Sequence, residues 1–143
     1  MSETNVAAAR RAYEHFVATG EPLEAAFHRD FVLDMSTFRG WPERQRYEGL
    51  AGLREFIGDW FGTWEEGGDF EVTELHEADE KVLVLIHLRG RAKSSGVSVE
   101  MEISHLITFK DGKQLRLVPY ASHAEGLAAA GIEGGKEEAP QSQ

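Results

Sequence analysis

The clearest alternation of apolar and polar residues in the chain runs from Val97 to Phe109. Successive side chains of a strand point to opposite faces, so this stretch predicts a half-buried strand. Its apolar face would carry Met101, Ile103, His105, Ile107 and Phe109. One imidazole therefore lies among four apolar neighbours. A buried imidazole needs a hydrogen-bond partner or stays neutral at a cost, so His105 indicates either a satisfied core residue or the wall of a pocket.

Three further segments have the same period of two and predict strands over residues 70–76, 82–91 and 114–120. The connections EADEK, KSSG and KDGK are short and polar, and they contain the turn residues that hairpins use. The four successive strands therefore predict an antiparallel meander.

The first half of the chain has mainly helical spacing. Residues 6–17 predict an amphipathic helix that Thr4 or Asn5 caps, and residues 50–64 carry the widest apolar stripe. Between them we expect a short helix over 23–27, a strand over 31–38, and a loop in RGWPERQRYEG. SHAEGLAAAG, near the C-terminal end, predicts one more short helix.

Helices followed by a long antiparallel sheet indicate an α+β fold. Long sheets twist and curl, so we expect a cone of three N-terminal helices packed on a curled antiparallel β-sheet, with a cavity inside. Residues 1–132 would form a single domain. Residues 133–143 have the Gly, Glu, Pro and Gln content of a disordered acidic tail.

Composition narrows the possible partners. The chain has 15 basic and 25 acidic residues and a net charge of −10, which argues against nucleic acids and anionic membranes as partners. It has no cysteine, its histidines follow no metal-ligand spacing, and no apolar run approaches the roughly 20 residues of a membrane helix. The N-terminal residues do not resemble a signal peptide, so we expect a cytoplasmic protein. The histidine spacing argues against a metal site.

Four segments together resemble the nuclear-transport-factor-2-like superfamily, and most closely its SnoaL-like polyketide cyclase branch. They are FHRDFVLD, YEGLAGLREFIGDW, VLVLIHLRGRAKSSGVSVE and HLITFKDGKQLRLVPYASHAEGLAAAGI. The resemblance implies an α+β cone, usually dimeric, with an apolar pocket and with acid–base chemistry that uses no cofactor. It also implies that His105 matches a strand histidine common in the family. An aspartate that the family carries after the last strand falls on Ser122, whose hydroxyl cannot replace a carboxylate base.

The candidate catalytic residues are His105, Asp34 and Tyr120. Imidazole can transfer a proton near neutral pH, and Asp34 is a carboxylate within an apolar segment. The alternation there is ambiguous, because Leu33 and Met35 could equally form the inward pair and leave Asp34 outside. A tyrosine hydroxyl at the end of the last strand could assist, or could simply belong to the rim.

The candidate substrate-binding residues are mostly aromatic or apolar side chains on the expected inner surface, although such residues also form ordinary cores. They are Tyr13, Phe16, Trp41, Tyr47, Phe56, Trp60, Met101, Ile103, Phe109, Val118 and Ser122. For Ser122, a structural role as the cap of the last helix, with Glu125 three residues later, competes with the role in binding.

The expected ligand is a small, mostly apolar molecule that bears a carbonyl or hydroxyl group. Cofactor-independent isomerisation, cyclisation or dehydration could accompany its binding. A ligand-binding protein without catalysis and a dimeric interaction module are the alternatives. Leu83 and Leu85 fall on the sheet face that the expected helices leave open, and this predicts a homodimer through that face.

Overall fold

The computed structural model describes residues 4–38, 41, 44–65 and 69–132. Six strands of this part of the chain form one sheet in the order β2-β1-β6-β5-β4-β3. The strands are β1 (Phe27–Asp34), β2 (Arg46–Glu48), β3 (Asp69–Ala78), β4 (Lys81–Arg91), β5 (Ser98–Lys110) and β6 (Lys113–Tyr120). The predicted meander β3-β4-β5-β6 is confirmed, with boundaries that differ by at most two residues.

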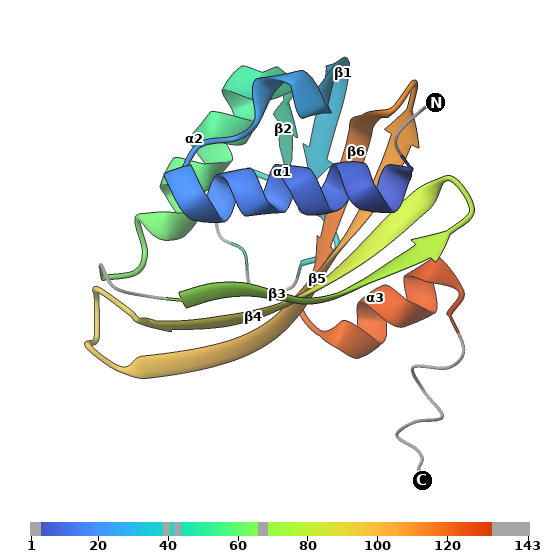
Figure 1. The fold of residues 1–143 in the computed structure, drawn as a ribbon. Coiled ribbons are helices and arrows are strands. Elements are labelled where there is room, and N and C mark those ends of the chain that lie inside the picture. The colour runs from blue at the N-terminus through green and yellow to red at the C-terminus, as the bar shows by residue number, and fades with distance from the viewer. Residues whose placement is uncertain (1–3, 39–40, 42–43, 66–68, 133–143) are drawn as a thin grey trace, which may run out of the picture.

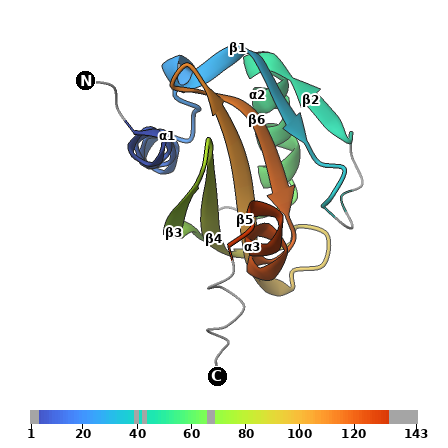
Figure 2. The ribbon, with the colours of Figure 1, turned by 90° about the vertical axis from the view of Figure 1, so that its right-hand side faces the viewer.

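Two helices cover the concave face of the sheet and one covers the other face (Figure 1). They are α1 (Asn5–Thr19), α2 (Gly49–Phe61) and α3 (His123–Ala130). Viewed along α1, the sheet runs from β3 and β4, which lie beside α1, to β1 and β2, which lie beside α2 (Figure 2). Helix α3 packs on β5 and β4. The α+β cone expected from the sequence is therefore present.

The arrangement differs from the expected one in its helices. Within the described part of the N-terminal half, α1 and α2 are the α-helices, and the third helix is C-terminal. The helix expected over residues 23–27 is a 3₁₀ turn, Glu24–Ala26. Strand β1 begins directly after it at Phe27, so too few residues remain for an α-helical hydrogen-bond ladder.

The sheet is mixed, whereas the expectation was a purely antiparallel one. Strand β1 pairs in parallel with β6, with Leu33 opposite Leu117, and this pairing joins the two ends of the domain. The short edge strand β2, within a segment expected to be a loop, pairs antiparallel with β1. These pairings close the cone on the side opposite β3.

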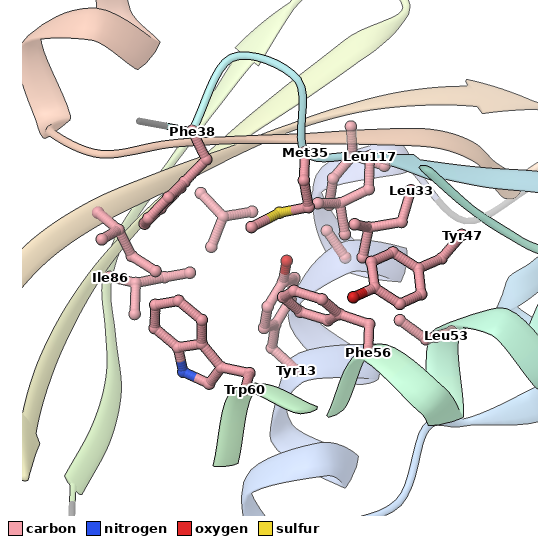
Figure 3. Packing of buried hydrophobic residues seen from close by; sticks show 14 of the residues in the cluster. Tyr13, Leu33, Met35, Phe38, Tyr47, Leu53, Phe56, Trp60, Ile86 and Leu117 are labelled. Carbon is pink, nitrogen blue, oxygen red and sulfur yellow. The ribbon is translucent and has the colours of Figure 1, made fainter. Parts of the chain in front are cut away.

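Side chains from both layers fill the concave side. Tyr13 from α1 and Phe56 and Trp60 from α2 converge with Met35 and Leu117 of the sheet layer (Figure 3). The first helix starts where the sequence indicates, because the Thr4 hydroxyl accepts a hydrogen bond from the Ala7 amide at 3.1 Å.

The second face of the sheet is not open, although the order of elements along the chain predicts that it would be. Leu83, Leu85 and Leu106 form a small cluster there, and Leu127 of α3 packs against it. Leu83 is fully buried and Leu85 is 5% exposed within one chain. These leucines therefore already have a partner in α3, and they give no reason to expect a second copy of the chain. The tail at residues 133–143 lies outside the described residues.

Candidate functional site

A cavity of about 90 Å³ lies between the helices and the concave face of the sheet. Among the described residues, its walls are apolar except at three side chains, Tyr13, His105 and Gln114. The remaining lining residues are Ala12, Phe16, Pro22, Leu23, Phe27, Leu33, Met35, Phe38, Leu53, Phe56, Ile57, Trp60, Phe61, Phe70, Ile103, Leu117 and Pro119. No carboxylate is among the described residues that line this cavity.

Tyr13 and His105 form a hydrogen-bonded pair at the cavity wall. The hydroxyl oxygen of Tyr13 is 2.6 Å from Nδ1 of His105. His105 faces inward because it alternates in phase with Ile103 and Ile107 on β5. Tyr13 lies on the buried face of α1, which packs over the neighbouring strands β3 and β4. A hydroxyl that donates to Nδ1 leaves the ring proton on Nε2, the nitrogen on the far side of the ring.

Burial keeps both members of the pair neutral. It lowers the pKa of His105 from 6.5 to about 3, because the apolar surroundings disfavour the imidazolium ion. The same burial raises the pKa of the Tyr13 hydroxyl, since a phenolate would also be poorly solvated there. At neutral pH the pair can therefore offer hydrogen bonds, but the imidazole is a weak base.

Asp34 lies away from the cavity. Leu33 and Met35, on either side of it in sequence, both line the cavity, so the carboxylate of Asp34 points to the opposite face. There it accepts hydrogen bonds from the Ser36 amide, at 2.9 Å, and from the Arg116 guanidinium. Partial burial acts to raise the pKa of Asp34, but the Ser36 hydrogen bonds and the charges of Arg116 and Arg46 outweigh it and hold the pKa below its usual value.

The residues expected at the end of the last strand also lie on the other side of the sheet. Tyr120 packs against the leucine cluster under α3, and Val118 stands opposite Leu106 of that cluster. Burial raises the pKa of the Tyr120 hydroxyl, with a further contribution from the Asp34 charge. Ser122 caps α3, and its hydroxyl accepts a hydrogen bond from the Glu125 amide at 3.1 Å. The structural role considered for Ser122 is thus confirmed.

Three candidates, Trp41, Tyr47 and Phe109, belong to the packed core and do not line the cavity. The rings of Phe56 and Trp60 each lie 5.5 Å from that of Trp41. Tyr47 is fully buried and donates a hydrogen bond to Asp59 at 2.9 Å, while Phe109 packs within the same apolar cluster.

Met101 lines a second cavity, of about 300 Å³, at the end of α2. Trp60 and Phe61 line both cavities, but the second one also has four charged residues in its wall, namely Glu65, Asp69, Arg89 and Lys93. It has no Tyr13–His105 pair. We therefore take the apolar cavity as the candidate site, lined by six of the expected residues: Tyr13, Phe16, Phe56, Trp60, Ile103 and His105.

Gln114 is a polar cavity residue that the sequence pattern does not reveal. Simple alternation along QLRLVPY puts Gln114 on the same face as Val118 and Tyr120, and on the opposite face from Leu115 and Leu117. A β-bulge changes this, because Thr108 of β5 pairs with Arg116 while the next residue, Phe109, pairs with Gln114. The extra residue on β6 reverses the phase of the strand and turns Gln114 inward. The sequence of the short turn KDGK, between β5 and β6, does not indicate this bulge.

The described residues contain no group of three or more His, Cys, Asp or Glu side chains that could hold a metal ion. Likewise, none of the helices in the part of the chain that the structure covers has the length and apolar character needed to cross a membrane.

The α+β cone, with its helix-covered apolar cavity, is consistent with the protein family that the sequence matches. The SnoaL-like domain family matches residues 6–117, and the chain belongs to this family. A comparison with curated proteins finds no match.

Solved structures with similar folds cover most of the chain. A nuclear-transport-factor-2-like protein of unknown function from Burkholderia pseudomallei is 21% identical, with a TM-score of 0.70, over 89% of this chain and 97% of that chain. TerC, co-crystallised with polyporic acid, is 19% identical, with a TM-score of 0.67, over 89% and 98%. A Mesorhizobium loti protein assigned as a SnoaL-like polyketide cyclase is 20% identical, with a TM-score of 0.62, over 82% and 99%. At these identities the similarity supports the fold.

Proposed function

We propose that the cavity binds a small, mostly apolar molecule through one carbonyl oxygen. The observation that carries this proposal is the 2.6 Å contact between the Tyr13 hydroxyl and His105 Nδ1 beside an apolar cavity. With Tyr13 donating to Nδ1, the neutral ring presents an Nε2–H group. A carbonyl oxygen is the natural acceptor for such a donor in a dry pocket.

The cavity volume restricts the size of the ligand. About 90 Å³ is less than the roughly 150 Å³ of an apolar protein cavity that holds benzene. A short chain of a few carbon atoms therefore suits the site better than a polycyclic skeleton. The apolar wall would supply most of the binding free energy, and the Tyr13–His105 pair would orient the oxygen.

The same geometry favours binding, or polarisation of the carbonyl, over proton abstraction. A base with a pKa of about 3 removes protons poorly at neutral pH, and the Asp34 carboxylate faces away from the cavity. If a reaction does occur, the neutral imidazole would act as a hydrogen-bond donor to a developing enolate, as the neutral histidine of triosephosphate isomerase does for its substrate carbonyl.

A titration by NMR tests the proposal. Acetone, 2-butanone and the tricyclic ketone anthrone are added to wild-type protein, and the ring signals of His105 are identified with a His105→Gln variant. We expect saturable shifts of the His105 signals with the first two ketones and none with anthrone. Absence of any ketone effect on His105 would refute binding at this site. Deuterium exchange next to the bound carbonyl in D₂O, above the rate in buffer, would show proton abstraction as well.

A further inference from the structure

The second cavity, at the end of α2, is larger than the first. Its volume of about 300 Å³ is well above the roughly 150 Å³ of an apolar protein cavity that holds benzene. The C-terminal end of α2 and the hairpin between β4 and β5 lie at the same end of the molecule (Figure 1), and the cavity lies between them. A ligand with two fused rings therefore fits the second cavity, whereas it exceeds the first.

Aromatic side chains form part of the lining. Trp60 and Phe61 belong to α2, and Trp64 follows that helix. The ring centroids of Trp60 and Trp64 are 6.1 Å apart, and their planes are inclined by 58°. The Trp64 ring packs against Gly90 of β4, where an added Cβ would lie 3.4 Å from Cε3 of the indole. The aliphatic lining residues of β4 and β5 are Leu88, Val99 and Met101. A flat aromatic ligand can therefore contact both indole faces and aliphatic groups.

Backbone contacts hold Lys93 next to Trp64 in the cavity wall. The Lys93 amide donates a hydrogen bond to the Thr63 carbonyl oxygen at 3.0 Å. Trp64 itself pairs with Ala92 in an isolated antiparallel β-bridge. These contacts fasten the segment after α2 to the end of β4, so the aromatic ring and the lysine lie together.

Lys93 gives the lining a positive charge without an acidic partner among the described residues. Each of the two acidic lining residues has an arginine partner. Oδ2 of Asp69 is 3.8 Å from Nε of Arg89, and Oε1 of Glu65 is 3.9 Å from Nε of Arg91. No ion pair joins Lys93 to another residue in the described part of the chain, and Lys93 is exposed. The charge left uncompensated here is positive and favours an anionic ligand over a cationic one.

We propose that the second cavity is a binding site for a small aromatic carboxylate. The ring of the ligand contacts the indoles of Trp60 and Trp64, and its carboxylate pairs with the Lys93 ammonium group. A single negative charge suits the site, because Glu65 and Asp69 in the same lining repel a more highly charged anion. This inference does not rest on the proposed function, which concerns a smaller ligand in the other cavity.

Three naphthalene derivatives that differ in charge test this inference. They are the anion 2-naphthoate, the neutral 2-naphthamide and the cation 2-naphthylmethylammonium. Dissociation constants are measured by NMR from the indole N–H signals, which are assigned with Trp60→Phe and Trp64→Phe variants. We expect a saturable shift of the Trp64 signal. The anion should bind about threefold to fivefold more tightly than the neutral amide, as one exposed ion pair provides, and the cation most weakly.

The Lys93→Gln variant removes the charge of an exposed side chain. In this variant the anion should lose its advantage, while affinity for 2-naphthamide should stay within about twofold of wild type. Lys81→Gln is the matched control, because Lys81 is an exposed lysine at the other end of β4 and does not line the cavity. There the preference for the anion should persist.

Four results would overturn the inference. Equal affinity of the wild-type protein for 2-naphthoate and 2-naphthamide would show that Lys93 pairs with no carboxylate. Tighter binding of the cation would show that the acidic lining residues dominate. Absence of a saturable Trp64 shift would show that the cavity takes no such ring. If Lys81→Gln abolishes the preference as Lys93→Gln does, the preference reflects the net charge of the protein and not this site.

Discussion

The Tyr13 hydroxyl and the His105 imidazole meet at 2.6 Å although 92 residues separate them in sequence. The contact joins α1 to the middle of β5, so it couples the helical layer to the sheet at the cavity wall. Neither residue has a carboxylate beside it among the residues described at the cavity. The pair is therefore a neutral hydrogen bond in apolar surroundings, and such bonds are sensitive to the loss of either partner.

Replacing Tyr13 with Phe should destabilise the fold, and the His105 ring should no longer be held in a single tautomer. The Tyr13→Phe variant leaves Nδ1 of a buried ring without its partner, which costs about 1–3 kcal/mol in free energy of unfolding. Urea denaturation measures this loss, and ¹⁵N chemical shifts of the ring should show a mixture of tautomers in place of one.

The matched control is Tyr47→Phe. Tyr47 is also buried, but its hydroxyl donates to Asp59 and not to a histidine. This variant should lose stability without altering the His105 shifts. If Tyr13→Phe leaves those shifts at their wild-type values, the hydrogen bond is not what fixes the tautomer.

His105 should make the protein less stable in mild acid. Its pKa is about 3 in the fold, against about 6.5 in the unfolded chain. Between these values the unfolded state binds one more proton, so the free energy of unfolding falls as the pH falls, by about 1.4 kcal/mol per pH unit inside this window. Above the unfolded-state pKa the effect is absent.

The His105→Gln variant removes this proton uptake and retains a group that can accept from Tyr13. Its free energy of unfolding should therefore decline less steeply than that of wild type between about pH 6 and pH 4.5, since the carboxylates contribute equally to both proteins. Identical slopes, together with an NMR titration of His105 near its ordinary pKa, would contradict the buried neutral ring.

Asp34→Asn should leave ligand binding unchanged. The carboxylate lies on the face opposite the cavity, so affinity for 2-butanone should stay within about twofold of wild type. The side chain of Asp34 is 18% exposed and that of Arg116 is 43% exposed, so loss of this ion pair should cost at most about 1 kcal/mol. Because the pKa of Asp34 is lowered in the fold, this contribution is present above the unfolded pKa of about 3.9 and disappears as the pH falls through the folded value. A strong loss of binding in this variant would place Asp34 in the site after all.

The fold was predictable where the pattern is long and local. Alternation over the whole of β5 predicted the strand and the inward direction of His105, and helical spacing put Tyr13 on the buried face of α1. By contrast, β2 has three residues, too few to show a period, and the parallel pairing of β1 with β6 depends on contacts between distant segments. The covering of Leu83 by α3 is equally non-local.

The candidate site was predictable only in part, for similar reasons. The sequence could place Tyr13 and His105 inside separately, but their contact depends on how α1 crosses the sheet. Asp34 was ambiguous because it lies between two apolar residues in a strand, and only packing decides which face is buried. Gln114 escaped detection because one extra residue in β6 reverses the alternation.

Helix α3 approaches the sheet closely at Gly126, which should tolerate no larger residue. Gly126 lies directly over Ser104 of β5, which is fully buried and donates a hydrogen bond to the Ser122 carbonyl oxygen at 2.9 Å. A methyl group at position 126 would lie 2.6 Å from Ser104 Cβ, closer still to its hydroxyl oxygen, and 3.0 Å from Leu83 Cδ1. The Gly126→Ala variant must therefore move α3 away from the leucine cluster. We expect a loss of about 2 kcal/mol or more in thermal or urea unfolding, as overpacking of a well-packed core typically causes.

Gly58→Ala is the matched control for this variant. Gly58 is an exposed position within α2, and a Cβ there would meet nothing within 4 Å. This substitution should stabilise the protein by about 0.5–1 kcal/mol, since alanine loses less backbone entropy in a helix. Adding Ser104→Gly to Gly126→Ala removes the side chain that the new methyl group meets, so it should restore part of the lost stability in spite of the cost of a glycine in a strand. If Gly126→Ala is as stable as Gly58→Ala, α3 does not pack on the sheet in the way that buries Leu83.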